Sequence, residues 1–207
     1  DAAGLDRLRT ATAWVDPQIQ IWNRSLYENL TYGNESPALE AVTEAADLKS
    51  IVEQLPSGMR TQLGENGGLV SGGEGQRVRV GRAMARKRVR LAILDEPARG
   101  LQHARRVDVI AEARRRWAGI TLLCVTHDIS DTAEFDRVLI IEDGRVVEDG
   151  DPAQLGNDPD SRYRQMLDSE AQLRRRLWAH PSWRRFRLMS GRLEESEELE
   201  VHVQSIR

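Results

Sequence analysis

Leu91-Ala92-Ile93-Leu94-Asp95-Glu96-Pro97 is the stretch that decides the fold, because four apolar residues run directly into two carboxylates. A short continuous apolar run of this kind predicts a strand of a parallel sheet that is buried on both faces. Upstream, a glycine-rich loop over residues 64–75 contains Ser71-Gly72-Gly73, which we expect to open a helix that is regular from about Glu74 to Arg86. The strand end is suited to hold a metal and activate water, and the helix start is suited to hold phosphate.

The composition is typical of a soluble globular chain, with 207 residues of which 40% are hydrophobic and 30% charged. The formal net charge of −3 gives no overall attraction to nucleic acid or to an anionic membrane. Cys124 is the single cysteine, so no disulfide can form within the chain. No apolar run approaches the roughly 18 residues of a membrane helix. The chain starts at Asp1 without a methionine or a signal-peptide pattern, and we expect it to be cut at its front.

Strand and helix patterns alternate along much of the chain, which predicts an α/β fold with a parallel sheet and crossover helices. The expected strands are residues 11–15, 91–94, 120–125 and 138–141. After the last of these strands, Asp143-Gly144 predicts a hairpin turn into Val146-Val147.

Helices are expected between and beyond these strands. One should begin at Ser36-Pro37 and continue to Leu55, within a mostly helical insert that adds no strand to the sheet. A second is expected over 104–117, and a third from Asp160 to about Ala179. For the second helix, the residues predicted to face inward are Val107, Ile110, Ala111 and Trp117.

Polar side chains follow the strands at the point where each strand ends, and ligands of open α/β sheets bind at that edge. Asp95 can hold Mg²⁺ through its waters, Glu96 can accept a proton from an attacking water, and His127 can stabilise charge on a transferred phosphoryl group. Gln18 can help to order the metal or the water. The free N–H groups of Ser71-Gly72-Gly73 favour anionic oxygens. This set suits transfer of a phosphoryl group to water.

Each piece of this constellation also has a purely structural interpretation. A serine followed by two glycines is often a flexible loop, an Asp-Glu pair after a strand is often a capping turn, and a histidine after a strand is often structural. The order of all the pieces and their shared sheet edge favour the functional interpretation.

Four motifs, in this order, resemble those of the nucleotide-binding domain of ATP-binding cassette (ABC) proteins. They are the Q-loop Val15-Asp16-Pro17-Gln18, the signature Val70-Ser71-Gly72-Gly73-Glu74, the Walker B stretch Ala92-Ile93-Leu94-Asp95-Glu96-Pro97, and the switch-histidine loop Thr126-His127-Asp128. The resemblance covers about residues 1–155. Within the family, residues 21–30 and 63–67 are similar to segments of the exporter branch.

The resemblance implies an incomplete ABC ATPase core over residues 1–18 and 69–155, a helical subdomain over 19–68, and a charged helical extension over 156–207. It implies ATP and Mg²⁺ as cofactors and a second nucleotide-binding domain as partner, together with the transmembrane domain of an exporter at the cytoplasmic face of the cell membrane. No nucleic acid is expected as a partner. The implied site residues are Ser71, Gly72, Gly73 and Glu74 for the partner's ATP, Asp95 and Gln18 for Mg²⁺, and Glu96, His127 and Gln18 for catalysis.

Three departures from the family pattern concern the nucleotide site. The phosphate-binding Walker A loop, of the form G-x-x-x-x-G-K-[ST], is absent, so we expect the chain alone to bind ATP weakly and to be inactive. Glu74 stands where the signature usually has glutamine, which adds negative charge near a phosphate. The D-loop reads Arg99-Gly100-Leu101-Gln102, which lacks the usual aspartate.

Two other functions stay open from the sequence. A non-catalytic ABC remnant or regulatory module would explain the missing Walker A loop and the altered D-loop. A soluble ABC ATPase acting on nucleic acid would need a long coiled coil between Gln18 and Ser71, where the sequence has no heptads. The arginine- and tryptophan-rich tail from about Asp160 to Arg187 predicts either a solvated helix whose tryptophans cover the domain or a contact with lipid headgroups, a protein partner or nucleic acid.

Overall fold

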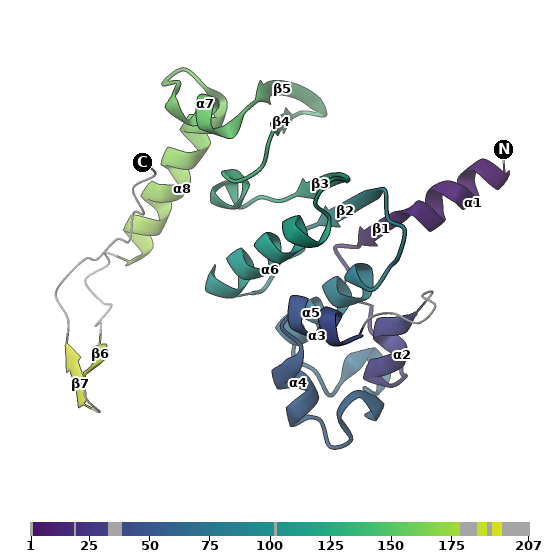
Figure 1. Cartoon of the computed structure of the whole chain (residues 1–207). Coiled ribbons are helices and arrows are strands. Elements are labelled where there is room, and N and C mark those ends of the chain that lie inside the picture. Colours follow the sequence, from purple (N-terminus) through teal and green to yellow (C-terminus); the bar gives the residue numbers. More distant parts are fainter. Residues whose placement is uncertain are drawn as a thin grey trace. The chain divides into compact units, whose positions relative to one another are not determined.

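The computed structural model describes residues 2–18, 20–32, 39–101, 103–178, 186–189 and 192–195, the last two ranges as backbone only. The chain divides into two compact units, residues 1–131 and 132–207 (Figure 1). Each unit is described by itself below.

A three-stranded parallel sheet forms the centre of the first unit. It follows helix α1 (Ala2–Ala11) and contains β1 (Thr12–Val15), β2 (Leu91–Asp95) and β3 (Thr121–Val125) in that spatial order. In register, Val15 lies beside Leu94, and Leu94 lies beside Cys124. The predicted α/β fold with a parallel sheet is therefore confirmed.

The two faces of this sheet differ in how they are covered. Ala13, Val15 and Leu94 on one face are almost fully buried in a hydrophobic core that also includes residues of helices α5 (Gly72–Met84) and α6 (His103–Arg116). On the other face, the side chains of Trp14 and Leu123 are 58% and 46% exposed. Burial on both faces, which the apolar run predicts, is therefore wrong for the described part of the unit. The alternating burial is typical of a sheet with one covered face.

The insert between β1 and α5 contains three short helices, α2 (Leu26–Thr31), α3 (Leu39–Ala45) and α4 (Lys49–Gln54). The predicted start at Ser36-Pro37 lies outside the described residues. The continuous helix predicted up to Leu55 is wrong, because the chain breaks at Asp47, where φ is +50°. Arg77 of α5 binds both the carbonyl and the carboxylate of Asp47, and these bonds stabilise the break.

Helices α5 and α6 begin close to their predicted positions. Ser71 is the N-cap of α5, so the regular helix starts at Gly72, two residues before Glu74. In α6, the predicted burial of Ile110 and Trp117 is confirmed, whereas Val107 is 49% exposed and the prediction for it is wrong. Ala111 is only half-buried, and Val109 and Ala113 take the inward positions instead.

The second unit contains an antiparallel hairpin of β4 (Val138–Glu142) and β5 (Arg145–Gly150). Its turn residues Asp143 and Gly144 have φ of +49° and +74°, as a tight two-residue hairpin turn requires. The hairpin prediction is therefore confirmed. The strand expected at 138–141 pairs antiparallel with β5, however, and is no member of the described parallel sheet.

Two helices and a second hairpin complete this unit. They are α7 (Pro152–Asn157), α8 (Arg162–Trp178), β6 (Phe186–Met189) and β7 (Arg192–Glu195). Helix α8 confirms the helix predicted from Asp160 to about Ala179. Trp183-Arg184-Arg185 of the arginine- and tryptophan-rich tail lie outside the described residues. Within the described part, none of the helices combines the length and the apolar character needed to cross a bilayer.

Candidate functional site

Glu96 and His127 meet at the carboxyl edge of the parallel sheet. Glu96 follows β2, and its backbone N–H donates to the carbonyl of Val125 in β3 over 2.9 Å. His127 lies two residues beyond the end of β3, and its Nδ1 lies 2.8 Å from Oε1 of Glu96. Parallel pairing of β2 and β3 thus brings together two residues that the sequence places on separate strands.

The electrostatics of this pair favour a protonated histidine. The hydrogen bond that the His127 ring makes to the Glu96 carboxylate raises the pKa of His127 above its ordinary value, and the charges of Glu96 and Asp128 raise it further. Partial burial and the charge of Arg106 oppose this shift. The imidazole is 70% exposed, so it can reach a ligand, while the Glu96 carboxylate is 21% exposed. A cationic ring beside a carboxylate can stabilise negative charge while the carboxylate accepts a proton.

A pocket of about 520 Å³ opens beside this pair. Its lining includes Arg99, Gly100 and Leu101, the three described residues of the predicted D-loop, whereas Gln102 lies outside the described residues. Arg106 also lines the pocket and pairs with Asp128 over 2.6 Å. The lining therefore combines two arginines, a histidine and two carboxylates, and Arg99 and His127 are the cationic groups that an anionic ligand could contact there.

Asp95 and Gln18 share this sheet edge. Asp95 is the last residue of β2, and the parallel pairing of Val15 with Leu94 places the segment after β1 at the same edge. Gln18 is exposed, and its backbone N–H donates to the carboxylate of Asp16 over 2.8 Å.

A metal ion at this edge would need ligands from a bound nucleotide in addition to those of the protein. No group of three or more His, Cys, Asp or Glu side chains in the described residues is arranged to hold a metal ion. Mg²⁺ in phosphate sites is commonly bound by one or two carboxylates together with water and phosphate oxygens. Asp95 with Gln18 therefore fits a Mg²⁺ ion that arrives with phosphate.

Ser71 to Glu74 form a separate site at the N-terminus of α5. The Ser71 N–H donates to the Glu74 carboxylate over 2.7 Å, and the Ser71 hydroxyl accepts from the Glu74 N–H over 3.4 Å. The first of these bonds lowers the pKa of Glu74 most. A side chain on Gly72 would meet open space, whereas one on Gly73 would come within 3.4 Å of Leu101. Ser71 to Gly73, which the sequence predicts to bind phosphate, thus form a capped helix start that lies against the predicted D-loop.

Three residues near Glu96 and His127 were missed by reasoning from the sequence. Gln76 and Arg79 of α5 donate to the carbonyl of Glu96, and Arg106 pairs with Asp128 next to the histidine. Two of them are polar positions on a helix face that the apolar pattern would assign to the core. A polar residue on such a face indicates that it meets a buried polar group, but the sequence does not identify which group that is.

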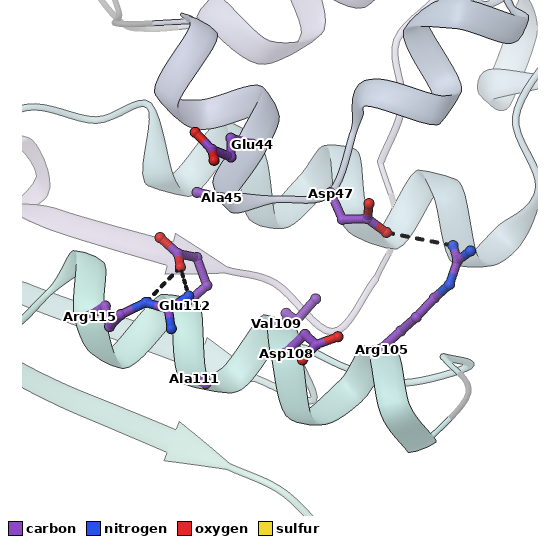
Figure 2. Close-up of a pocket in the computed structure, with 9 residues that line it drawn as sticks. All are labelled: Glu44, Ala45, Asp47, Arg105, Asp108, Val109, Ala111, Glu112 and Arg115. Carbon is purple, nitrogen blue, oxygen red and sulfur yellow. Dashed lines mark hydrogen bonds and ion pairs between the residues drawn. The ribbon is translucent and has the colours of Figure 1, made fainter.

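A second pocket, of about 190 Å³, lies between α3 and α6 (Figure 2). Figure 2 shows that Arg105 and Arg115 each pair with a carboxylate of the same pocket, Asp47 and Glu112 respectively. Because these charges are paired within the pocket, we assign it no ligand.

Comparisons with known proteins identify relatives over much of the chain. An ATP-dependent lipid A-core flippase of Alkalilimnicola ehrlichii is 34% identical over 155 residues, which are 73% of this chain and 26% of the flippase. The ABC transporter B family member 21 of Arabidopsis thaliana is 32% identical over 164 residues, 77% of this chain and 12% of that protein. No family model matches the sequence.

A solved structure gives the same result. A bacterial Atm1-family ABC exporter with ATP bound superposes with a TM-score of 0.73 and 26% sequence identity, over 79% of this chain and 29% of the exporter chain. The chain therefore spans about a quarter of the length of these bacterial proteins.

Proposed function

Because the chain belongs to the ABC exporter family, we propose that it is part of an ATP-hydrolysing nucleotide-binding domain that drives transport across a membrane. The observation that carries this proposal is the contact of 2.8 Å between Glu96 and His127, which lie at the end of adjacent parallel strands. A carboxylate paired with a histidine beside a pocket that Arg99 and Arg106 also line is suited to attack by water on a phosphoryl group.

In the proposed reaction, Glu96 accepts a proton from the attacking water. His127, whose pKa is raised chiefly by its hydrogen bond with Glu96, stabilises in its protonated form the negative charge that develops on the transferred phosphoryl group. Asp95 and Gln18 would hold Mg²⁺, whose chemistry is to neutralise phosphate charge. Asp95 lies directly before Glu96 in the chain, so the metal and the proton acceptor would be fixed by the same strand end.

The helix start at Ser71 supports a composite site formed with a partner. Ser71, Gly72 and Gly73 present the positive end of α5, and no hydrogen bond joins them to Glu96 or His127 in the described residues. We therefore propose that this turn contacts ATP held by a second nucleotide-binding domain. The other proposed partner is the transmembrane domain of the exporter at the cytoplasmic face of the membrane. The lipid A-core named for several bacterial relatives suggests an amphiphilic substrate.

The test is ATP turnover by a transporter that contains this chain and a complete nucleotide site. Glu96→Gln should lower turnover by about 10²–10⁴-fold, the usual contribution of a general base, and leave ATP bound. Glu53→Gln, on the exposed face of α4, is the matched control and should not change turnover. Unchanged turnover in Glu96→Gln would refute the assignment of the base. Absence of turnover in both the unmodified protein and the control would favour a non-catalytic module.

A further inference from the structure

The side chain of Gln76 connects α5 to the strand end that carries Glu96. Gln76 is 1% exposed, and its Nε2 donates to the carbonyl of Glu96 over 3.0 Å and to the carbonyl of Pro97 over 2.5 Å. Twenty residues separate Gln76 from Glu96 in the sequence, so these bonds are tertiary contacts. The side-chain amide of Gln76 therefore donates both of its hydrogens to backbone carbonyls of a single turn.

Arg79, one helical turn further along α5, donates to the same carbonyl. Its Nη2 lies 3.2 Å from the Glu96 oxygen, and the residue is 3% exposed. Its Nε and Nη1 have no hydrogen-bond partner in the described part of the chain. Burial lowers the pKa of Arg79 to about 10, and the charges of Asp16 and Asp95 oppose that shift. Burying a guanidinium with unused donors is costly, so its place here needs a compensating role.

The backbone of Glu96 is the strained element that both side chains contact. Its φ of +48° lies in the left-handed region, which is unfavourable for a residue with a side chain. Such a conformation persists only where the surroundings hold it. On one side the Glu96 N–H is fixed by the carbonyl of Val125, and on the other its carbonyl is fixed by Gln76 and Arg79.

We propose that Gln76 and Arg79 are positioning residues that hold Glu96 in its left-handed conformation and thereby direct its carboxylate to His127. The inference rests on the proposed function for the role of Glu96, while the contacts themselves stand apart from it. Both positioning residues lie on the helix that Ser71 caps. Helix α5 thus joins the turn proposed to contact a partner's ATP to the backbone of the proposed base of this chain. A shift of α5 when that ATP binds would move Glu96 directly.

The experiment follows the titration of the His127 ring by ¹⁵N NMR in the whole 207-residue chain without nucleotide. The charged groups that face the ring are Glu96, Asp128 and Arg106. Gln76→Met keeps the side-chain length and removes the donor. We expect the pKa of His127 to fall in this variant toward the value in Glu96→Gln, because the carboxylate is no longer aimed at the ring. Val80→Ala, which removes buried apolar volume from the same helix, should leave the pKa unchanged.

A second variant covers the case in which Gln76→Met does not fold. Arg79→Met removes a positive charge, which by itself would raise the pKa of His127, so a fall would report loss of positioning. An unchanged or raised pKa in folded Gln76→Met and Arg79→Met would overturn the proposal. In the unmodified chain, the Gln76 side-chain amide should exchange slowly with solvent, and fast exchange would also overturn it. Because no nucleotide is present, failure here is distinguishable from failure of the proposed ATPase activity.

Discussion

At the scale of single residues, Glu96 is fixed by its backbone before its side chain takes part in any chemistry. The left-handed φ turns the chain sharply after β2, and the carboxylate then lies 2.8 Å from His127. A different backbone conformation at this position would keep both residue types and lose their contact. The backbone conformation at this strand end therefore determines where the carboxylate of the motif lies.

The His127–Glu96 contact predicts a pH dependence of stability. The pKa of His127 in the folded chain is raised above the ordinary histidine value of 6.5, so the contribution of the pair to stability is fully present below that pH and is lost as pH rises through the folded pKa. Because the ring is 70% exposed, we expect the pair to contribute less than about 1 kcal/mol to the free energy of unfolding. Urea unfolding at pH 6 should show unmodified chain more stable than Glu96→Gln, and the difference should shrink by pH 9. A difference that grows with pH would contradict the assignment.

Reasoning from the sequence predicted that Glu96 and His127 lie at one edge of the sheet, because both follow apolar runs and the ends of parallel strands share an edge. It could not predict Gln76 or Arg79, because a helix pattern reports which positions face inward and not which backbone carbonyl they meet. The break at Asp47 was missed for a similar reason. The apolar spacing continues through it, and the side chain that binds the carbonyl of the turn, Arg77, lies 30 residues away.

At the scale of elements, the position of α5 depends on tight packing against neighbouring segments as well as on hydrogen bonds. A side-chain carbon added to Gly81 would lie 3.1 Å from atoms of Leu30 and of Leu48, and 3.2 Å from Ala46. The glycine thus lets the helix lie against α2 and the turn before α4. A sequence pattern would count this glycine as a weak helix former, and its packing role appears only in three dimensions.

Gly81→Ala tests this packing. Helix propensity alone would stabilise the variant by about 1 kcal/mol, whereas crowding in a packed core costs about 1–3 kcal/mol. We expect crowding to win, with a net loss of about 1 kcal/mol in the free energy of unfolding measured in urea. Gly72→Ala is the control on the same helix, because its added carbon meets nothing within 4 Å, and it should not be destabilising. A stabilised Gly81→Ala variant would show that the neighbouring side chains move aside at little cost.

At the scale of the whole molecule, the proposed function assigns the chain parts of two nucleotide sites. The edge with Asp95, Glu96 and His127 supplies the proposed metal ligand, base and cation. The start of α5 supplies donors, and one of them, the Ser71 N–H, already binds Glu74. The parallel sheet could be predicted from the alternation of strand and helix patterns, whereas the order of its strands was not predicted. The exposed face with Trp14 could not, because an apolar run indicates only that a strand prefers burial.

This division predicts weak nucleotide binding by the 207-residue chain. Phosphate affinity in such sites comes largely from a cradle of backbone N–H groups and an adjacent lysine. The lysines of this chain, Lys49 and Lys87, follow leucine and arginine rather than the glycine of a phosphate loop. Isothermal titration with ATP and Mg²⁺ should therefore detect no binding in the micromolar range. The Glu74→Gln variant, which removes the carboxylate from the helix start, should stay equally weak, because a helix terminus without the cradle holds phosphate poorly. A micromolar dissociation constant for the unmodified chain would mean that residues outside the proposed motifs bind the phosphates.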